Sequence, residues 1–299
     1  MAKGKGNATA KFEVMSNAEY RQREGLASTD IKRMMKSMAT WKYFVDHPEE
    51  ERDTPALKFG RAYHKFCLEP YDFENEYIVC PKIDKRTKDG KAAYEEFLKS
   101  AGNKEVIDEE TYEQLVAMRT VLYATPYVKK LINGEHEKSF FWTDEKTGIK
   151  CKCRPDSFGA FGSGNVIVDL KTTSDAETEA FMRSALKFNY DVQAAHYTAG
   201  LETIYGKEFA FVFIAQETKA PYLVNVLQAD DYFMQNGRDV RDQMLNTYKK
   251  CIELNEYPAY NGFKEEKRYI NSLSLPKWLI NAMEYEADDF EESESESED

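Results

Sequence analysis

The stretch CKCRPDSFGAFGSGNVIVDLKTT, residues 151–173, combines the pattern of a buried strand with charged residues. Residues 166–170 are almost entirely apolar, a pattern typical of a strand that is buried on both faces. Asp169 and Lys171 interrupt this pattern. Burying charged side chains costs free energy unless they meet a partner, a metal or a substrate. We therefore expect Asp169 and Lys171 to belong to a site that supplies one.

The strand geometry predicts which side chains share that site. Residues two apart on a strand point to the same face, so Asp169 and Lys171 project together and Leu170 faces the opposite side. Asp156 comes at the end of the preceding strand, and the glycine-rich turn SFGAFGSGN can return the chain antiparallel beside it. Two carboxylates this close repel each other unless a cation lies between them, and oxygen ligands favour Mg²⁺ or Mn²⁺.

Such a patch suits phosphodiester hydrolysis. A metal polarises the phosphate and lowers the pKa of a bound water, and a lysine stabilises the developing negative charge. A bare D-x-K triplet is weak evidence, because roughly one or two are expected by chance in a chain this charged. Asp30-Ile31-Lys32 is such a triplet, at a predicted helix start, and we attribute it to chance. Asp156 could equally cap a turn, and Lys171 could extend from a strand end into solvent.

The remaining pattern predicts a mixed α/β (α+β) domain with a helical N-terminal part. Capping residues, proline and apolar periodicity indicate helices before residue 131, and alternation then indicates strands. The predicted helices cover residues 28–47, 54–70, the second half of 81–100, 109–131, 175–187, 190–205 and 230–254. The predicted strands form a strand–turn–strand unit over 137–156, followed by 166–173, 209–216 and 221–228.

Charge and composition leave a nucleic-acid partner open. Residues 284–299 hold ten acids and no base, and without them the net charge of −12 falls to −2. A nearly neutral body can still carry a basic groove. We expect a cytoplasmic protein without a membrane segment, because the N-terminus lacks the apolar run of a signal peptide and no segment is long and apolar enough to span a bilayer.

The motifs resemble those of a known superfamily. RPD followed by VDLK resembles the signature of the PD-(D/E)xK nucleases. GRAYH, residues 60–64, resembles the GxxxH motif of the RecB-like branch, and QAAHY, residues 193–197, resembles its QxxxY motif. Taken in order, LASTDIKRMMKS, ALKFGRAYHKFCLEP, DGKAAYEEFL, CKCRPD, VDLKTTSDA and YDVQAAHYTAGL resemble the RecE-type exonuclease domain, which includes exonuclease VIII and its phage and prophage relatives.

This resemblance implies a restriction-endonuclease-like core, with a central mixed β-sheet flanked by helices. It also implies a Mg²⁺-dependent exodeoxyribonuclease, with Mn²⁺ as a substitute, that digests one strand of linear double-stranded DNA from its 5′ end. The resulting 3′ overhangs would serve phage-type recombination inside a bacterial host. Relatives are encoded beside a single-strand annealing protein and form rings around DNA. The resemblance therefore implies double-stranded DNA ends and an annealing protein as partners, and a homo-oligomeric ring as the assembly. The 5′ polarity follows from the resemblance alone.

The resemblance also implies roles for individual residues. His64, alone more typical of a hydrogen-bonded helix histidine, would bind the metal with Asp156 and Asp169, and Glu137 would lie near that metal. Lys171 would be the catalytic lysine, with Asp169 and Asp156 beside it. Gln193 and Tyr197 would line the active site.

The resemblance covers part of the chain, which we divide accordingly. We expect a flexible N-terminal arm over residues 1–25, the exonuclease domain over 26–262, a C-terminal extension over 263–283 and a disordered acidic tail over 284–299. The tail could simply solubilise the protein, or it could dock a partner.

Two other groups of residues have competing interpretations. Cys151 and Cys153 alternate onto one strand face, but no second pair lies at ligand spacing and Cys251 stands alone, so we expect neither zinc nor an iron–sulfur cluster. A basic segment could grip DNA phosphates or form a solvated loop, and Arg154 could contact a phosphate or pair with an acid. The basic residues of that segment are Lys82, Lys85, Arg86, Lys88 and Lys91.

Two alternative functions remain open. A structure-specific or restriction-like endonuclease could use the same core, and closed circular DNA would reveal it because an exonuclease needs an end. A catalytically silent DNA-end-binding scaffold is the second alternative, and metal-dependent release of nucleotides would exclude it.

Overall fold

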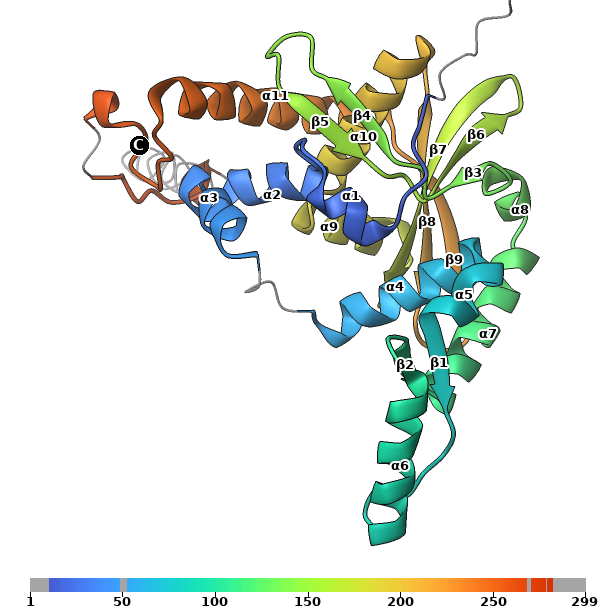
Figure 1. The fold of residues 1–299 in the computed structure, drawn as a ribbon. Coiled ribbons are helices and arrows are strands. Elements are labelled where there is room, and N and C mark those ends of the chain that lie inside the picture. The colour runs from blue at the N-terminus through green and yellow to red at the C-terminus, as the bar shows by residue number, and fades with distance from the viewer. Residues whose placement is uncertain (1–10, 49–52, 268–269, 278, 282–299) are drawn as a thin grey trace, which may run out of the picture.

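The computed structural model describes residues 11–48, 53–267, 270–277 and 279–281. Its centre is a five-stranded mixed sheet in the order β3-β6-β7-β8-β9, in which β7 and β8 are parallel and the other neighbours antiparallel (Figure 1). The strands are β3 (Glu135–His136), β6 (Ser157–Phe161), β7 (Gly164–Thr173), β8 (Ala210–Glu217) and β9 (Val224–Gln228). This sheet, flanked by helices, confirms the predicted mixed α/β class with a central mixed sheet.

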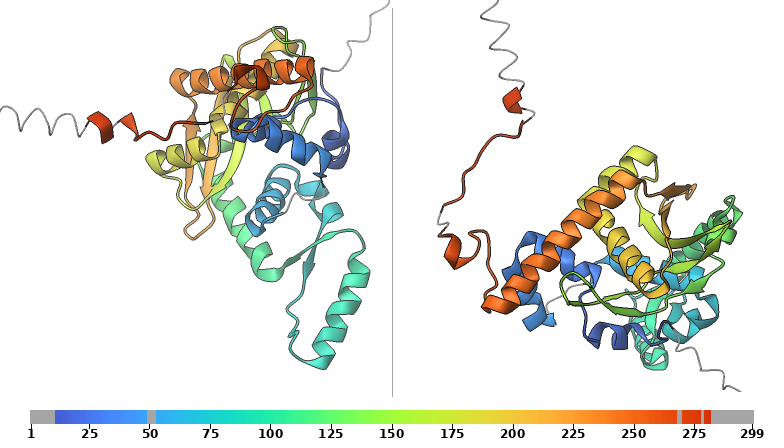
Figure 2. Two further views of the ribbon diagram at one scale, coloured as in Figure 1. Left: turned by 90° about the vertical axis from the view of Figure 1, so that its left-hand side faces the viewer. Right: turned by 90° about the horizontal axis from the view of Figure 1, so that it is seen from above.

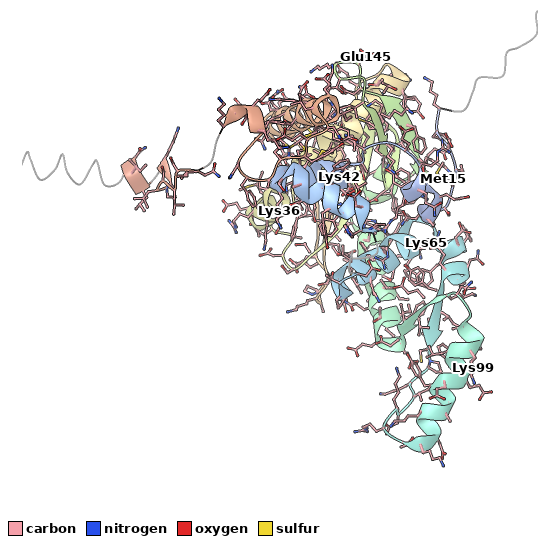
Figure 3. All side chains as sticks on the ribbon, turned by 60° about the vertical axis from the view of Figure 1, so that its left-hand side comes forward. Met15, Lys36, Lys42, Lys65, Lys99 and Glu145 are labelled. Carbon is pink, nitrogen blue, oxygen red and sulfur yellow. The ribbon has the colours of Figure 1, made fainter. Side chains whose placement is uncertain are left out.

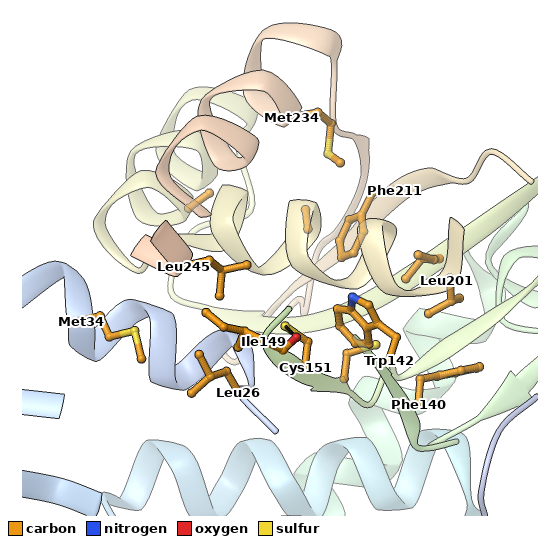
Figure 4. Close-up of a cluster of buried hydrophobic side chains, with 14 of the residues drawn as sticks. Leu26, Met34, Phe140, Trp142, Ile149, Cys151, Leu201, Phe211, Met234 and Leu245 are labelled. Atoms are coloured by element: carbon orange, nitrogen blue, oxygen red, sulfur yellow. Dashed lines mark hydrogen bonds between the residues drawn. The ribbon is translucent and has the colours of Figure 1, made fainter. Parts of the chain in front are cut away.

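Helices cover both faces of the sheet. One face of β7 and β8, with Ile167 and Phe211, packs with α2 (Ser28–Lys36), α10 (Tyr190–Tyr205) and α11 (Asp231–Leu254), as Figure 4 shows for part of this cluster. The other face, with Leu170, packs with α4 (Pro55–Leu68) and α7 (Glu109–Ala124). The predicted alternation is therefore confirmed: Leu170 faces α4, and Asp169 and Lys171 face α10.

The strand–turn–strand unit before β6 has a different place from the one expected. β4 (Phe140–Thr143) and β5 (Lys150–Cys153) pair antiparallel with each other as a separate two-stranded sheet. Cys151 and Cys153 on β5 are buried in the same cluster as α10. The unit therefore covers α10 instead of extending the central sheet.

The glycine-rich segment is a strand and not only a turn. Residues 157–161 form β6, paired antiparallel with β7, and the turn shrinks to residues 162–163 with Gly162 at φ 61°. Phe158 is buried in the core, which favours the extended backbone. Asp156 consequently precedes β6 instead of ending the strand before the turn.

Two predicted helices are each divided in two. The first breaks at Ser37, whose hydroxyl accepts the Thr40 N–H at 2.9 Å and caps α3 (Met38–Asp46). The helix predicted over 109–131 ends at Ala124 and resumes as α8 (Val128–Leu131). Pro126 and the left-handed Tyr127, with φ 65°, separate these two parts. The predicted helices at 175–187, 190–205 and 230–254 correspond to α9 (Thr178–Lys187), α10 and α11.

A projecting arm combines the helix predicted in the second half of residues 81–100 with two strands that the pattern did not predict. β1 (Tyr77–Cys80) follows α5 (Pro70–Glu76) and pairs parallel with β2 (Glu105–Asp108), and α6 (Lys88–Ala101) connects the two strands. Figures 1 and 2 show α6 extending away from the central sheet. Strands of four residues are too short to show a clear alternation, which is why the sequence did not reveal them.

Residues 11–25 do not form the flexible arm that we expected. They contain α1 (Asn17–Gln22), and Glu13 pairs through its backbone with Ser139. The Lys152 ammonium donates to the carbonyl oxygens of Tyr20 and Arg21 at 3.1 and 3.2 Å. These contacts fix the segment on β5, whereas residues 1–10 and the predicted acidic tail at 284–299 lie outside the described residues.

The described part of the C-terminal extension begins on the body, where the Phe263 ring is buried and lies under the Lys250 ammonium. Among the residues that the structure describes, no helix has both the length and the apolar character needed to cross a bilayer.

Candidate active site

A cavity of about 930 Å³ opens between α4, the segment before α1 and the end of β7. Its walls include Met15 and Lys65, both labelled in Figure 3, together with His64, Glu137 and Lys171. The cavity therefore brings together several of the predicted site residues.

Three potential metal ligands lie together at this cavity. His64 comes from α4, Glu137 directly follows β3, and Asp156 directly precedes β6. One ligand atom from each lies within 4.8 Å of the other two, and His64 Nδ1 is 3.3 Å from Asp156 Oδ1. An imidazole nitrogen with two carboxylates is a donor set that suits a divalent cation, so these residues fit the metal that the motifs imply.

The charges of this cluster also fit a cation. Burial raises the pKa of Glu137, and the nearby Asp156 charge raises it further, to about 7. Burial alone would raise the pKa of Asp156, but the His64 and Lys171 charges and the Leu170 N–H outweigh it, so this pKa is lowered. A cation among these groups would favour the ionised form of Glu137 and so compete with the proton.

Asp169 and Lys171 form a buried pair next to the cluster. The Lys171 ammonium contacts Asp169 Oδ2, and Gln193 Nε2 donates to Asp169 Oδ1 at 2.7 Å. Burial would lower the pKa of Lys171, but the Asp169 and Asp156 charges raise it above its usual value. Lys171 therefore carries a positive charge beside the cavity, and Asp169 is held by Lys171 and Gln193 instead of lying among the three clustered ligands.

The two tyrosines near the site differ in their positions. Tyr197, expected to line the active site, is not in the cavity wall and packs against the core cluster, with its ring 6.4 Å from that of Phe211, and burial raises its pKa well above the usual value. Tyr190 instead lines the cavity, and the Lys171 ammonium lies 4.7 Å from its ring centroid. Tyr190 carried no motif signal, so the sequence did not indicate it.

The predicted DNA-binding residues are divided between two places. Arg154 lines the cavity and its Nε lies 3.0 Å from Glu137 Oε2, so it pairs with an acid of the site. The segment 82–91 lies instead on the projecting arm, where Lys85 covers the Tyr94 ring at 3.5 Å and Arg86 pairs with Asp84. The structure does not bring Lys82, Lys85, Arg86, Lys88 or Lys91 to the cavity.

Lys32 is a site residue that the sequence analysis set aside. Its ammonium lies 3.4 Å from Gln193 Oε1 and 5.1 Å from the Tyr190 ring centroid. Asp30 of the same triplet has a structural part, because its carboxylate accepts the Ala27 N–H at 2.8 Å and caps α2. The triplet therefore does not act as a unit. Only the fold reveals that its lysine reaches Gln193.

Comparison with known proteins agrees with this architecture. Residues 27–268 match the family model described as a PDDEXK-like domain of unknown function (DUF3799). A crystal structure of a protein from Eubacterium rectale, named as a candidate exonuclease, superposes with a TM-score of 0.57 at 14% identity, over 90% of this chain and 98% of that chain. At this identity the likeness shows a shared fold.

A second solved structure, SSO0001, matches with a TM-score of 0.29 at 14% identity, over 67% of this chain and 88% of that chain, and this overlap is too low to support an argument. The comparison with curated proteins gave no match.

Proposed function

This chain belongs to the family of PDDEXK-like domains, and from that premise we propose that it is a Mg²⁺-dependent exodeoxyribonuclease of the RecE type. The match to the PDDEXK-like domain directly supports nuclease chemistry. The finer proposal is that the enzyme digests one strand of linear duplex DNA from its 5′ end and leaves 3′ overhangs.

One observation supports this function above the others. The His64, Glu137 and Asp156 ligand atoms cluster within 4.8 Å at the cavity that Lys171 also lines. A divalent metal held by this cluster would polarise the scissile phosphate and lower the pKa of a bound water. Mg²⁺, with Mn²⁺ as a substitute, suits the two carboxylates.

The chain's own residues would perform the remaining tasks. Lys171, which is charged and close to the cluster, would stabilise negative charge that develops on the phosphate. Asp169 would hold Lys171 in place, and Gln193 would fix Asp169 by its 2.7 Å hydrogen bond. We also propose Asp169 as a further metal ligand, a role that requires Lys171 to move from Asp169 toward the substrate phosphate.

The biological setting is proposed from the motif resemblance alone. It comprises phage-type recombination, cooperation with a single-strand annealing protein and assembly as a ring around DNA. The 5′ polarity is proposed from the same resemblance.

The test uses linear duplex DNA labelled at the 5′ or the 3′ end, incubated with Mg²⁺ or with EDTA, in parallel with closed circular DNA. We expect early, Mg²⁺-dependent release of the 5′ label as mononucleotide, with the circles left intact. Nicked circles would support an endonuclease instead. Absence of cleavage with Mg²⁺ and with Mn²⁺ would leave a DNA-end-binding scaffold as the better account.

A further inference from the structure

Lys32 of α2 lies at the site without an acidic partner. In the described part of the chain, no carboxylate oxygen lies within the 4.0 Å ion-pair distance of its ammonium. Its polar contact is a neutral one, with Gln193 Oε1 at 3.4 Å. A partly buried ammonium that faces only an amide oxygen and an aromatic ring is short of negative charge.

The cations that line the cavity differ from Lys32 in their partners. Arg61 pairs with Asp53 at 2.8 Å, Lys65 pairs with Glu69 at 3.0 Å, and Lys171 pairs with Asp169. Each of these cations therefore has a carboxylate in direct contact, whereas among the described residues Lys32 has none within ion-pair distance. A ligand that carries its own negative charge would complete the site.

The surroundings of Lys32 disfavour its charged form when no such ligand is present. Burial, followed by repulsion from Lys171, lowers the pKa of Lys32 to about 7, although Asp169 and Asp191 oppose this effect. The two ammonium groups share the Tyr190 ring, at 4.7 Å for Lys171 and 5.1 Å for Lys32. Two cations held this close favour an anion that extends past both of them.

The hydrogen bonds connect Lys32 to the catalytic residues in a chain. Lys32 contacts Gln193 Oε1, Gln193 Nε2 donates to Asp169 Oδ1, and Asp169 Oδ2 contacts Lys171. Lys32 therefore lies at the far end of this chain from Lys171. A polymer with regularly spaced phosphates could occupy both ends at once.

We propose that Lys32 forms a second phosphate subsite, which binds a backbone phosphate of the substrate strand next to the scissile one. This inference rests on the proposed function in naming DNA as the ligand. It assigns to the N-terminal helix α2 a direct contact with the substrate, in addition to its packing on α10.

The test measures DNA binding and not cleavage. A short duplex is bound to the protein in EDTA, and each phosphate near one 5′ end is replaced in turn by an uncharged methylphosphonate. The wild type is compared with Lys32→Met, which keeps the unbranched shape and most of the length of the side chain and removes its charge. Lys36→Met is the matched control, because Lys36 is exposed one turn further along α2 (labelled in Figure 3).

We expect Lys32→Met to weaken binding about tenfold to a hundredfold, as for the loss of one charge-assisted hydrogen bond. The slope of log K against log salt concentration should fall by about 0.9, the value for one phosphate. One methylphosphonate should weaken the wild type and have no further effect in Lys32→Met. Lys36→Met should keep the wild-type response at that phosphate.

If every methylphosphonate weakens the binding of Lys32→Met by the same factor as that of the wild type, the proposal is overturned and Lys32 is a residue that positions Gln193. Lys32→Gln, measured in the same way, decides the matter if Lys32→Met does not fold. The outcome is separable from that of the proposed function. If the wild type cleaves DNA but the effects of Lys32→Met and of each methylphosphonate simply add, the subsite alone is refuted. If the wild type binds DNA without cleaving it, and one methylphosphonate has no further effect in Lys32→Met, the proposed enzyme is refuted and Lys32 remains a phosphate-binding residue.

Discussion

Asp156 Oδ2 accepts the backbone N–H of Leu170 at 2.6 Å, while its Oδ1 lies 3.3 Å from His64 Nδ1. One carboxylate thus joins β7 to α4 through the residue that precedes β6. Its two roles, accepting the Leu170 N–H and binding a metal, can be separated because only metal binding requires a charge.

Asp156→Asn should separate these roles. The asparagine keeps an oxygen for the Leu170 N–H but loses the charge that a metal needs, so we expect cleavage to fall at least about a hundredfold. Asp156→Ala additionally leaves a buried N–H unpaired, which should lower the free energy of unfolding by about 1–3 kcal/mol relative to Asp156→Asn. Cleavage assays and urea unfolding test this. Equal stability of the two variants would contradict the proposal that the hydrogen bond from the Leu170 N–H to Asp156 stabilises the fold.

Lys171→Met should destabilise the protein as well as inactivate it. Asp169 is only 1% exposed, and without Lys171 its carboxylate would keep a single hydrogen bond, from Gln193. Breaking a buried pair in this way costs about 3–5 kcal/mol.

The double variant Asp169→Asn/Lys171→Met is the control, since it removes both charges together. Urea unfolding should find the double variant more stable than Lys171→Met alone. If both unfold at the same urea concentration, the buried charge is not the cause of the loss.

Metal affinity should depend on pH near neutrality. The pKa of Glu137 is about 7, and the Asp156 charge raises the pKa of His64 against the effect of burial. Both groups must be deprotonated to bind a metal, so affinity should fall as the pH drops below about 7, by up to about tenfold per pH unit for each proton displaced. Calorimetric titration with Mn²⁺ tests this, and Glu137→Gln should bind more weakly with a shallower pH dependence.

The same raised pKa of Glu137 makes the stability of the metal-free protein change with pH in the opposite direction to the metal affinity. A carboxyl group whose pKa is raised on folding favours the folded state least once it is ionised. The contribution of Glu137 to the free energy of unfolding should therefore decline as the pH rises from its ordinary pKa of 4.5 through about 7. Thermal unfolding in EDTA should show this decline in the wild type and less of it in Glu137→Gln.

Gly237→Ala should disturb the helix that carries Gln193. A Cβ at Gly237 on α11 would lie 2.1 Å from the carbonyl oxygen of Asp191 on α10, and backbone cannot easily yield. We expect a loss of at least about 1–3 kcal/mol in the free energy of unfolding, together with reduced activity. Gly164→Ala on β7 is the control, because its nearest contact would be an ordinary 3.9 Å. Comparable losses in the two variants would contradict this explanation.

Several parts of the fold could be predicted because they depend on local pattern. The two-residue period of β7 predicts that Asp169 and Lys171 share a face, and the structure has both on the face toward α10. The α4 helix likewise follows from its Thr54 cap, Pro55 and its apolar spacing. The predicted hairpin did bring Asp156 close to β7, although β6 replaced most of the expected turn.

Other parts could not be predicted, because they depend on which elements meet. The break at Ser37 and the strands of the projecting arm lacked a distinct signal. The basic segment 82–91 had the composition of a phosphate-binding loop, but its position on the arm separates it from the cavity. Composition alone does not carry the information on where a loop points.

The local pattern and the motifs were enough to predict the strand that holds Asp169 and Lys171, and the candidate residues His64, Glu137, Asp156 and Gln193. The packing of the whole chain was needed to show that Asp169 lies outside the cluster of His64, Glu137 and Asp156, and that Lys32 reaches Gln193, 161 residues away along the chain. The physical reason is that strand and helix periods are set by neighbouring residues. The contacts of the site are set instead by how α2, α4 and α10 pack on the two faces of one sheet, and local pattern does not specify that packing.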